Sequence, residues 1–114
     1  LPISMLKAKK AAYEQATYAY EKTVLNAFKD AYNAIAEFNK VKEIYETRLR
    51  LEQASKSTLD LAQLQYLNGV IGYMDLLDAQ RGYLDAQIGL SNAVRDKQIS
   101  MVNLYKALGG GWKE

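Results

Sequence analysis

Two carboxylates, Asp75 and Asp78, are the residues whose type and spacing come nearest to a chemical site. A carboxylate pair can act as general acid and base, but such a site also needs a pocket and commonly a His or a metal ion. The 114 residues include no His and no Cys, which excludes nucleophilic triads that use either residue, thiolate zinc sites and disulfides. We therefore expect no catalytic residue, no metal site and no cofactor.

The two carboxylates lie in an acidic part of a nearly neutral chain. Residues 57–94 carry Arg81 against four Asp, whereas residues 1–56 carry ten Lys or Arg against seven Asp or Glu. The whole chain has a formal net charge of +2, which gives no reason to expect nucleic acid as a partner. Acids at the N-terminus of a helix are often there only because they interact favourably with the helix dipole. This structural interpretation of Asp75 and Asp78 stands beside a functional one.

The acids are carried by helices, the first of which is unusually long. Good helix formers dominate from about residue 6, apolar residues recur at spacings of three and four, and neither Pro nor Gly interrupts residues 3–68. Asn68-Gly69 then supplies a left-handed helix-ending signal. This pattern predicts a helix over about 6–67, followed by a turn over 68–72. The turn residues that we single out are Asn68, Gly69 and Gly72.

A second helix is predicted over about 73–108, with Gly72 at its start and Gly109 after its last apolar residue. The short connection makes the two helices antiparallel neighbours, so the predicted fold is an all-α coiled-coil hairpin. Gly109 to Gly111 with Trp112 predict a chain reversal with an aromatic plug. Two series of residues at seven-residue spacing predict the seam: Leu76, Tyr83, Leu90, Lys97 and Leu104, and Gln80, Gln87, Val94, Met101 and Leu108.

The N-terminal half of the long helix has no partner within the predicted hairpin. It carries Tyr13, Tyr20 and Val24, and a helix this apolar does not stay single in water. Two arrangements remain open for the isolated chain. In one it associates through residues 8–35, and in the other residues 54–58, which are weak in helix propensity, bend it into a three-helix arrangement.

Three stretches of the chain resemble the C-terminal repeat of the TolC family of outer membrane efflux proteins. They are Tyr66-Leu-Asn-Gly69, Tyr73-Met-Asp75-Leu-Leu-Asp78-Ala-Gln-Arg81 and Leu104-Tyr-Lys-Ala-Leu-Gly-Gly-Gly-Trp112. Upstream, Leu1-Pro-Ile3 resembles the end of a barrel strand, and Tyr20 to Phe28 resembles the upper part of the long helix of that repeat. The order and spacing of these stretches make the resemblance specific.

The resemblance implies a passive, homotrimeric efflux channel of a Gram-negative cell outer membrane. Residues 1–114 would be one helical fragment of its periplasmic α-barrel, with residues 109–114 as its Gly-rich end. The implied partners are the other protomers, a periplasmic adaptor protein and an inner-membrane pump, and membrane contact would come only through parts of the parent outside this chain. The alternative from a different class is a small helical-hairpin module that binds a partner protein.

The resemblance also assigns roles to residues near the turn, which it places at the periplasmic entrance. Tyr66 matches a Tyr of the closed-state hydrogen-bond network, and Asp75 and Asp78 match acids that form rings around the entrance. Ile71 stands where the family prototype has Arg, so a hydrophobic contact or a leakier tip replaces the expectation of a salt-bridge lock. Gln80 and Gln87 are expected to face a wet lumen.

Overall fold

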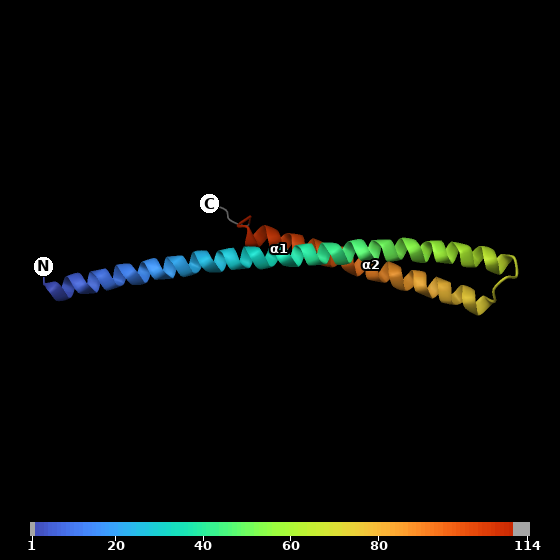
Figure 1. Cartoon of the computed structure of the whole chain (residues 1–114), viewed down its shortest axis with the longest axis horizontal. Coiled ribbons are helices and arrows are strands. Elements are labelled where there is room, and N and C mark those ends of the chain that lie inside the picture. Colours follow the sequence, from blue (N-terminus) through green and yellow to red (C-terminus); the bar gives the residue numbers. More distant parts are fainter. Residues whose placement is uncertain (1, 111–114) are drawn as a thin grey trace.

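The computed structural model describes residues 2–110 as two antiparallel helices, α1 (Ile3–Leu67) and α2 (Tyr73–Ala107) (Figure 1). The helices form a rod with extents of 99 × 25 × 14 Å. Helix α2 runs back along the C-terminal half of α1, and the N-terminal half of α1 projects beyond it. The predicted helical hairpin is confirmed.

Helix α1 begins at Ile3, about three residues earlier than predicted. The carbonyl of Pro2 accepts hydrogen bonds from the N–H groups of Met5 and Leu6, at 3.1 and 3.2 Å. Pro is well suited to precede a first helical turn because it has no N–H group to leave unsatisfied. Ile3 is thus helical, which differs from its resemblance to a strand end, and Leu1 lies outside the described residues.

The three-helix arrangement is not what the structure shows, because α1 continues without a break through residues 54–58. Ser57 and Thr58 turn their hydroxyl groups back onto the helix, where they donate to the carbonyl oxygens of Gln53 and Ala54 at 3.2 and 3.0 Å. Their side chains are thereby satisfied within the helix, and low intrinsic propensity does not bend it.

The turn between the helices follows its predicted chemistry. Gly69 has a φ of 72°, the left-handed conformation that glycine adopts at little cost. Its N–H donates to the carbonyl of Tyr66, and the N–H of Val70 donates to that of Gln65 at 2.8 Å. This pair of bonds is a Schellman motif, which satisfies the last carbonyl groups of α1. Gly72 is the N-cap of α2, as predicted.

The same motif ends α2. Gly109 has a φ of 82°, its N–H donates to the carbonyl of Lys106, and the N–H of Gly110 donates to that of Tyr105 at 2.9 Å. Gly110 also lies against the Tyr105 ring so closely that a β-carbon there would collide with it. The predicted chain reversal is therefore present at Gly109, and Trp112 lies outside the described residues.

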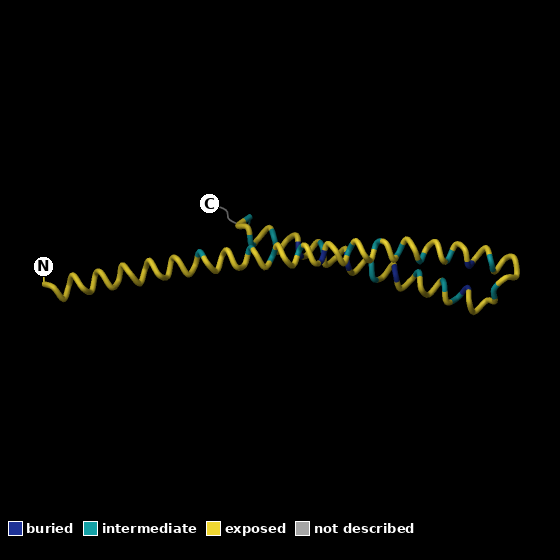
Figure 2. The backbone as a smooth tube through the Cα atoms, in the orientation of Figure 1, coloured by how far each residue is buried: buried dark blue, intermediate teal, exposed yellow. Residues whose placement is uncertain are grey.

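The seam between the helices is built from small side chains. Ala86, Ala93 and Ser100 recur every seventh residue of α2 and are only 4%, 3% and 4% exposed (Figure 2). Small residues on a helix surface let the partner helix approach closely. The hydroxyl of Ser100 is satisfied by the carbonyl of Lys97 at 2.8 Å. Close approach of α2 to α1 is thus the main source of burial.

One of the two predicted seam series is confirmed and the other is wrong. Leu76 is buried and the other members of its series are half-buried. The second series, from Gln80 to Leu108, is exposed throughout. The true second series precedes it by one residue, because small side chains rather than large ones fit between the helices. It consists of Ala79, Ala86, Ala93, Ser100 and Ala107.

The N-terminal half of α1 stands free of α2. Tyr13 and Tyr20 are 74% and 71% exposed, and Figure 2 shows this part of α1 as exposed along nearly its whole length. Tyr13 and Tyr20 precede the buried Val41 by multiples of seven residues. The stripe of α1 residues that packs on α2 therefore continues into the unpartnered half of the helix. In residues 2–110, neither helix has an apolar stretch long enough to span a membrane.

Gly69→Ala and Gly82→Ala should have opposite effects on stability. The first places a side chain at a left-handed residue and should lower the free energy of unfolding by about 1–2 kcal/mol. The second replaces a helical glycine with open space around it and should raise that free energy by up to about 1 kcal/mol. Denaturant titration followed by circular dichroism measures both, and equal effects would contradict the assigned turn.

Ala93→Leu should destabilise the hairpin by about 1–3 kcal/mol, because the larger side chain forces the helices apart. Ala54→Leu, on an exposed position of α1, makes the same chemical change away from the seam and should be nearly neutral. The two unfolding midpoints provide the comparison. A tolerated leucine at position 93 would show that small residues do not set the helix separation.

Candidate functional site at the hairpin tip

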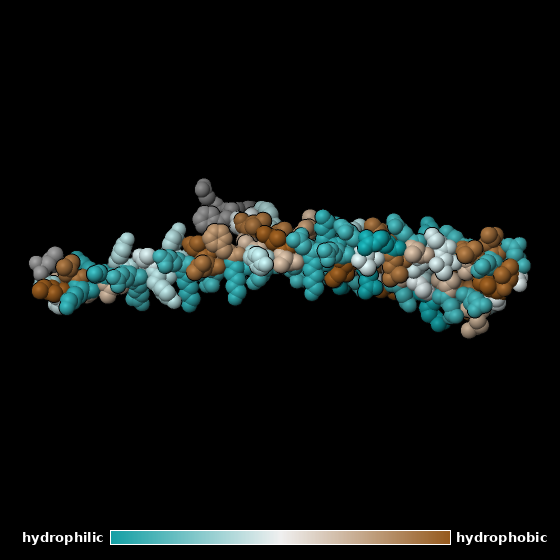
Figure 3. Space-filling model, in the orientation of Figure 1, coloured by the Kyte–Doolittle hydropathy of each residue, from teal (hydrophilic) through white to brown (hydrophobic). Residues whose placement is uncertain are grey.

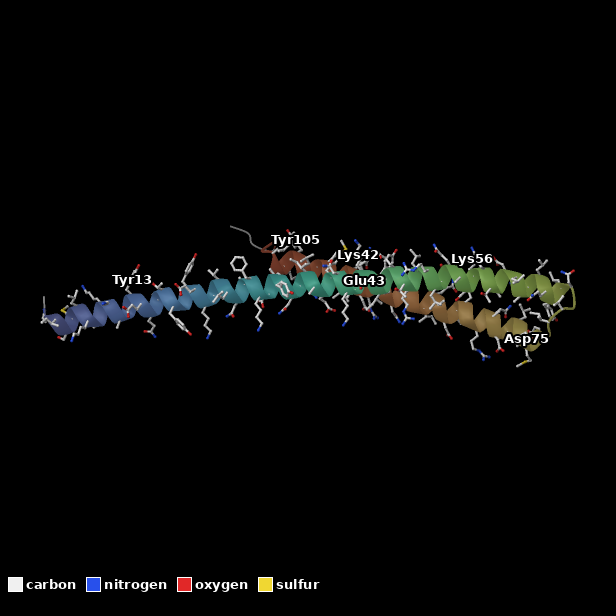
Figure 4. The ribbon with its side chains drawn as sticks, in the orientation of Figure 1. Tyr13, Lys42, Glu43, Lys56, Asp75 and Tyr105 are labelled. Atoms are coloured by element: carbon white, nitrogen blue, oxygen red, sulfur yellow. The ribbon has the colours of Figure 1, made fainter. Side chains whose placement is uncertain are left out.

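The two predicted carboxylates lie at the start of α2, beside the turn (Figure 4, Asp75 labelled). Asp75 accepts the N–H of Gly72 at 3.4 Å, so it caps the helix as an acid of the first turn commonly does. Asp78 is 4.0 Å from the Arg81 guanidinium, and both side chains are about 70% exposed. Solvent weakens such a pair. Both carboxylates therefore remain open to water.

Tyr66 closes the turn by packing. Its ring centroid is 5.8 Å from that of Tyr73, with the planes inclined at 55°. Gln63, Leu67 and the buried Leu76 lie around the same hollow. The contact that the structure assigns to Tyr66 is thus aromatic, and its part in a closed-state hydrogen-bond network stays a prediction. The predicted turn residues Asn68, Gly69 and Gly72 all lie between the helices.

The tip is apolar at its extremity. Leu67 is 81% exposed, and Val70 and Met74 are both exposed by about two-thirds. Ile71 is half-buried in the turn. Exposed apolar side chains gathered at one end of a protein commonly mark a contact with another protein.

The carboxylates and the two glutamines lie on different sides of α2. Each residue turns an α-helix by about 100°, so Asp78 and Gln80, two residues apart, point about 160° apart. Gln87 repeats the position of Gln80 one heptad later. The acids and these glutamines therefore lie on different sides of α2, and the expectation that Gln80 and Gln87 face a wet lumen stays a prediction.

The carboxylates belong to one side of the whole hairpin. Asp96 and Ile99 follow Asp75 and Asp78 by three heptads and line a shallow cavity of about 270 Å³ with Glu37 and others. The other side of the hairpin carries Gln80 and, four heptads later on α2, Leu108. Phe28 of α1 lies on that side with Leu108. We call the first side the acidic face and the second the opposite face. The acidic face comprises Asp75, Asp78, Asp85 and Asp96 of α2 with Glu37 of α1; Lys40 lines the same cavity as Glu37, and Arg95 pairs with Asp96 at 3.2 Å.

Polar contacts cross the seam in the middle of the hairpin. The Tyr83 hydroxyl donates to Glu52 Oε1 at 3.2 Å, and the Lys97 ammonium group lies 4.4 Å from the centroid of the Tyr45 ring. The Arg48 side chain lies across Gly89. The seven-residue pattern of α2 predicts that Tyr83 and Lys97 lie in the seam, but it does not identify their partners. The seven-residue spacing of Tyr45 and Glu52 on α1 was the available signal.

The pKa of the Tyr83 hydroxyl is raised in the folded chain. Partial burial between the helices raises the pKa of Tyr83 above its ordinary value of 10.0, and the hydrogen bond and negative charge of Glu52 and the charge of Asp60 raise it further. Each of these causes disfavours the phenolate.

No metal-binding group of three or more carboxylates is assembled within residues 2–110.

Both a family model and individual relatives relate the chain to outer membrane proteins. A family model described as outer membrane efflux protein matches residues 3–110. The chain is 33% identical over 112 residues to the outer membrane protein OprJ of Pseudomonas aeruginosa, covering 98% of this chain and 23% of OprJ. No solved structure matches.

Two further relatives carry efflux in their names. The toluene efflux pump outer membrane protein TtgC of Pseudomonas putida is 38% identical over 95 residues, covering 83% of this chain and 20% of TtgC. The cation efflux system protein CusC of Escherichia coli O6:H1 is 30% identical over 101 residues, covering 89% of this chain and 22% of CusC. The chain thus spans less than a quarter of the length of these relatives.

Tyr83→Phe should reduce the alkaline sensitivity of the hairpin. Because the folded-state pKa is raised, the unfolded chain loses this proton first, so its contribution to stability is present below about pH 10 and is lost as the pH rises towards the folded pKa. Unfolding midpoints measured on both sides of that pH provide the test. Tyr105→Phe is the control, since Tyr105 is largely exposed. Identical pH profiles for the wild type and Tyr83→Phe would contradict the assignment.

Proposed function

The chain belongs to the outer membrane efflux protein family, and we propose that it forms part of the helical wall of a trimeric channel through which compounds leave the cell passively. In this proposal, residues 1–114 are one element of a periplasmic α-barrel, with residues 109–114 at its Gly-rich end. The family confirms the predicted localisation in the cell outer membrane of a Gram-negative bacterium. The conduit itself performs no catalysis.

The observation that carries the proposal is the unequal length of the two helices. Helix α1 has 65 residues and α2 has 35, so α2 can cover only part of the stripe that runs along α1. Tyr13 and Tyr20 continue that stripe and are exposed in the single chain. A barrel wall supplies neighbouring helices on both sides of each helix, which is the covering that such a rod requires.

The acidic face is the side that we assign to the lumen. Asp75 and Asp78 are exposed and lie next to the turn, where three protomers would bring six carboxylates towards one opening. Negative charge focused in a constriction favours cations and attracts multivalent cations most strongly. The opposite face carries Gln80 and Gln87 away from the lumen in this orientation.

The turn is the part that we assign to the periplasmic entrance. Its exposed apolar residues, including Leu67 and Val70, support contact there with an adaptor protein and, through it, with an inner-membrane pump. Tyr66, already packed on Tyr73, would hold the closed conformation of the tip. Ile71 would contribute an apolar contact to closure instead of an ion pair.

The hairpin is proposed to conduct rather than to select the exported compound. Relatives named for toluene efflux and for cation efflux both match it over more than four-fifths of its length. A wall shared by systems with such different names offers no pocket chemistry specific to one compound. The substrate would then be chosen by other components of the assembly.

Replacing Asp75 and Asp78 with Ala in the full-length protein should weaken block by a trivalent cation by at least about tenfold, because six carboxylates leave the entrance. Single-channel conductance in a planar bilayer, titrated with the blocker from the tip side, measures the effect.

Asp60→Ala is the matched control, since Asp60 is an acid close to Tyr83 on the opposite face. It should leave the block unchanged. Equal block in the wild type and the double variant would refute the entrance role, and an equal loss in Asp60→Ala would refute the orientation of the hairpin.

A further inference from the structure

Arg48 begins at a seam position of α1, but its side chain is exposed. It follows the buried Val41 by seven residues and precedes the buried Ala62 by fourteen. A guanidinium group is not buried between helices that pack closely through alanines, because its charge would lose water without gaining an acid as partner. The side chain therefore lies across α2, with its stem on the helix surface and its charge in water.

Gly89 of α2 provides the place for the guanidinium group. A β-carbon at Gly89 would lie 3.3 Å from Nη1 of Arg48, 3.5 Å from its Cδ and 3.7 Å from its Cζ. The head of the arginine thus rests on the glycine. Gly89 follows Asp75 by two heptads and precedes Asp96 by one, so it lies in line with these two carboxylates of the acidic face. A positive charge of α1 is thereby placed at the acidic face of α2.

The Arg48 charge has no carboxylate partner in the described part of the chain, since the two ion pairs of residues 2–110 do not include it. Along α2, the first acids on either side of Gly89 are Asp85, about one helical turn away, and Asp96, which is already paired with Arg95. The planar fork of donors on Arg matches a carboxylate or phosphate group. The arrangement therefore suits an anion that comes from outside the chain.

The middle of the hairpin, where Arg48 crosses, is more polar than the tip. On the side in view, Figure 3 shows mainly hydrophilic side chains along this stretch and hydrophobic ones gathered at the tip. The hydrogen bond from Tyr83 to Glu52 and the contact of Lys97 with Tyr45 belong to the same stretch. A polar surface with an unpaired cation suits a water-filled passage better than a dry contact with another helix.

We infer that Arg48 forms a ring of three guanidinium groups inside the channel, where carboxylate or phosphate groups of an exported compound pair in passing. The inference rests on the proposed function, with the acidic face towards the lumen. Gly89 is fourteen residues from Asp75, or about 21 Å along α2. This separation is about twice the distance over which 0.1 M salt screens a charge. The ring therefore acts independently of the acids at the entrance.

The arginine ring complements the entrance acids. Carboxylates in a constriction attract cations and oppose the passage of anions. A positive ring deeper in the same passage attracts anionic groups and lowers the electrostatic barrier to their passage. A conduit with both rings can then pass compounds of either charge.

Arg48→Met in the full-length protein tests the inference, because it removes the charge and keeps an apolar side chain on Gly89. We expect the permeability ratio of K⁺ to Cl⁻ to rise about twofold or more. The reversal potential of the channel in a planar bilayer under a KCl gradient measures this ratio. Arg48→Lys keeps the charge and should leave the ratio close to the wild-type value.

Arg50→Met is the matched control. Arg50 is two residues further along α1, points about 160° away from Arg48 and donates to the Thr47 hydroxyl at 3.3 Å. The substitution removes the same charge from another side of the helix and should leave the ratio unchanged. Block by a trivalent cation at the entrance should also be unchanged in Arg48→Met, because salt screens the two sites from each other.

An unchanged permeability ratio in Arg48→Met, or an equal rise in Arg50→Met, would overturn the inference. Neither result would affect the proposed channel, whose own test is the loss of trivalent block on replacement of Asp75 and Asp78. A full-length protein that forms no conducting pore would refute the proposed function and this inference with it.

Discussion

Two helices with no third layer can bury only one stripe each, and the rest of this molecule depends on that limit. The stripe on α2 is lined by small residues such as Ala86 and Ala93, so the helix backbones approach closely and little apolar area is available to either. Every other apolar side chain stays in water until another chain or segment covers it. A hairpin of this kind is therefore complete only as part of a larger assembly.

The helices could be predicted from helix propensity and apolar spacing, and their C-terminal ends from Gly69 and Gly109, where the backbone is left-handed. The full seam could not. A search for large apolar residues selects Val94 and Met101, which lie one residue beyond the buried Ala93 and Ser100. Alanine is only weakly hydrophobic, so a pattern of large apolar residues does not reveal it, although closely packed helices need small residues between them. The three-helix alternative was wrong because low helix propensity at residues 54–58 was its only basis. In the helix, the hydroxyl groups of Ser57 and Thr58 donate hydrogen bonds to backbone carbonyls, so the helix does not bend there.

Resemblance could locate the tip residues but not their spatial relation. Asp78 and Gln80 are two positions apart in sequence, and helical geometry alone places them on different sides. The structure adds that Asp75 already caps α2 through Gly72, so its position at the start of a helix needs no further explanation. What makes the acids notable is that Asp85 and Asp96 extend the same face. The spacing of Tyr45 and Glu52 marks a stripe on α1, but pairing Glu52 with Tyr83 also required the register between the two helices, which that spacing does not supply.

The small residues of α2 recur every seventh position, and this period restricts how such a rod can change in evolution. Inserting one residue into either helix rotates everything beyond it by about 100° and turns the stripe away from its partner. A complete heptad restores the orientation, provided that the facing helix gains one as well. Lengthening therefore proceeds in paired steps of about 10 Å. For the channel that we propose, the reach across the periplasm would therefore change only in whole heptads, so lineages adapting to cell envelopes of different depth would differ by whole heptads.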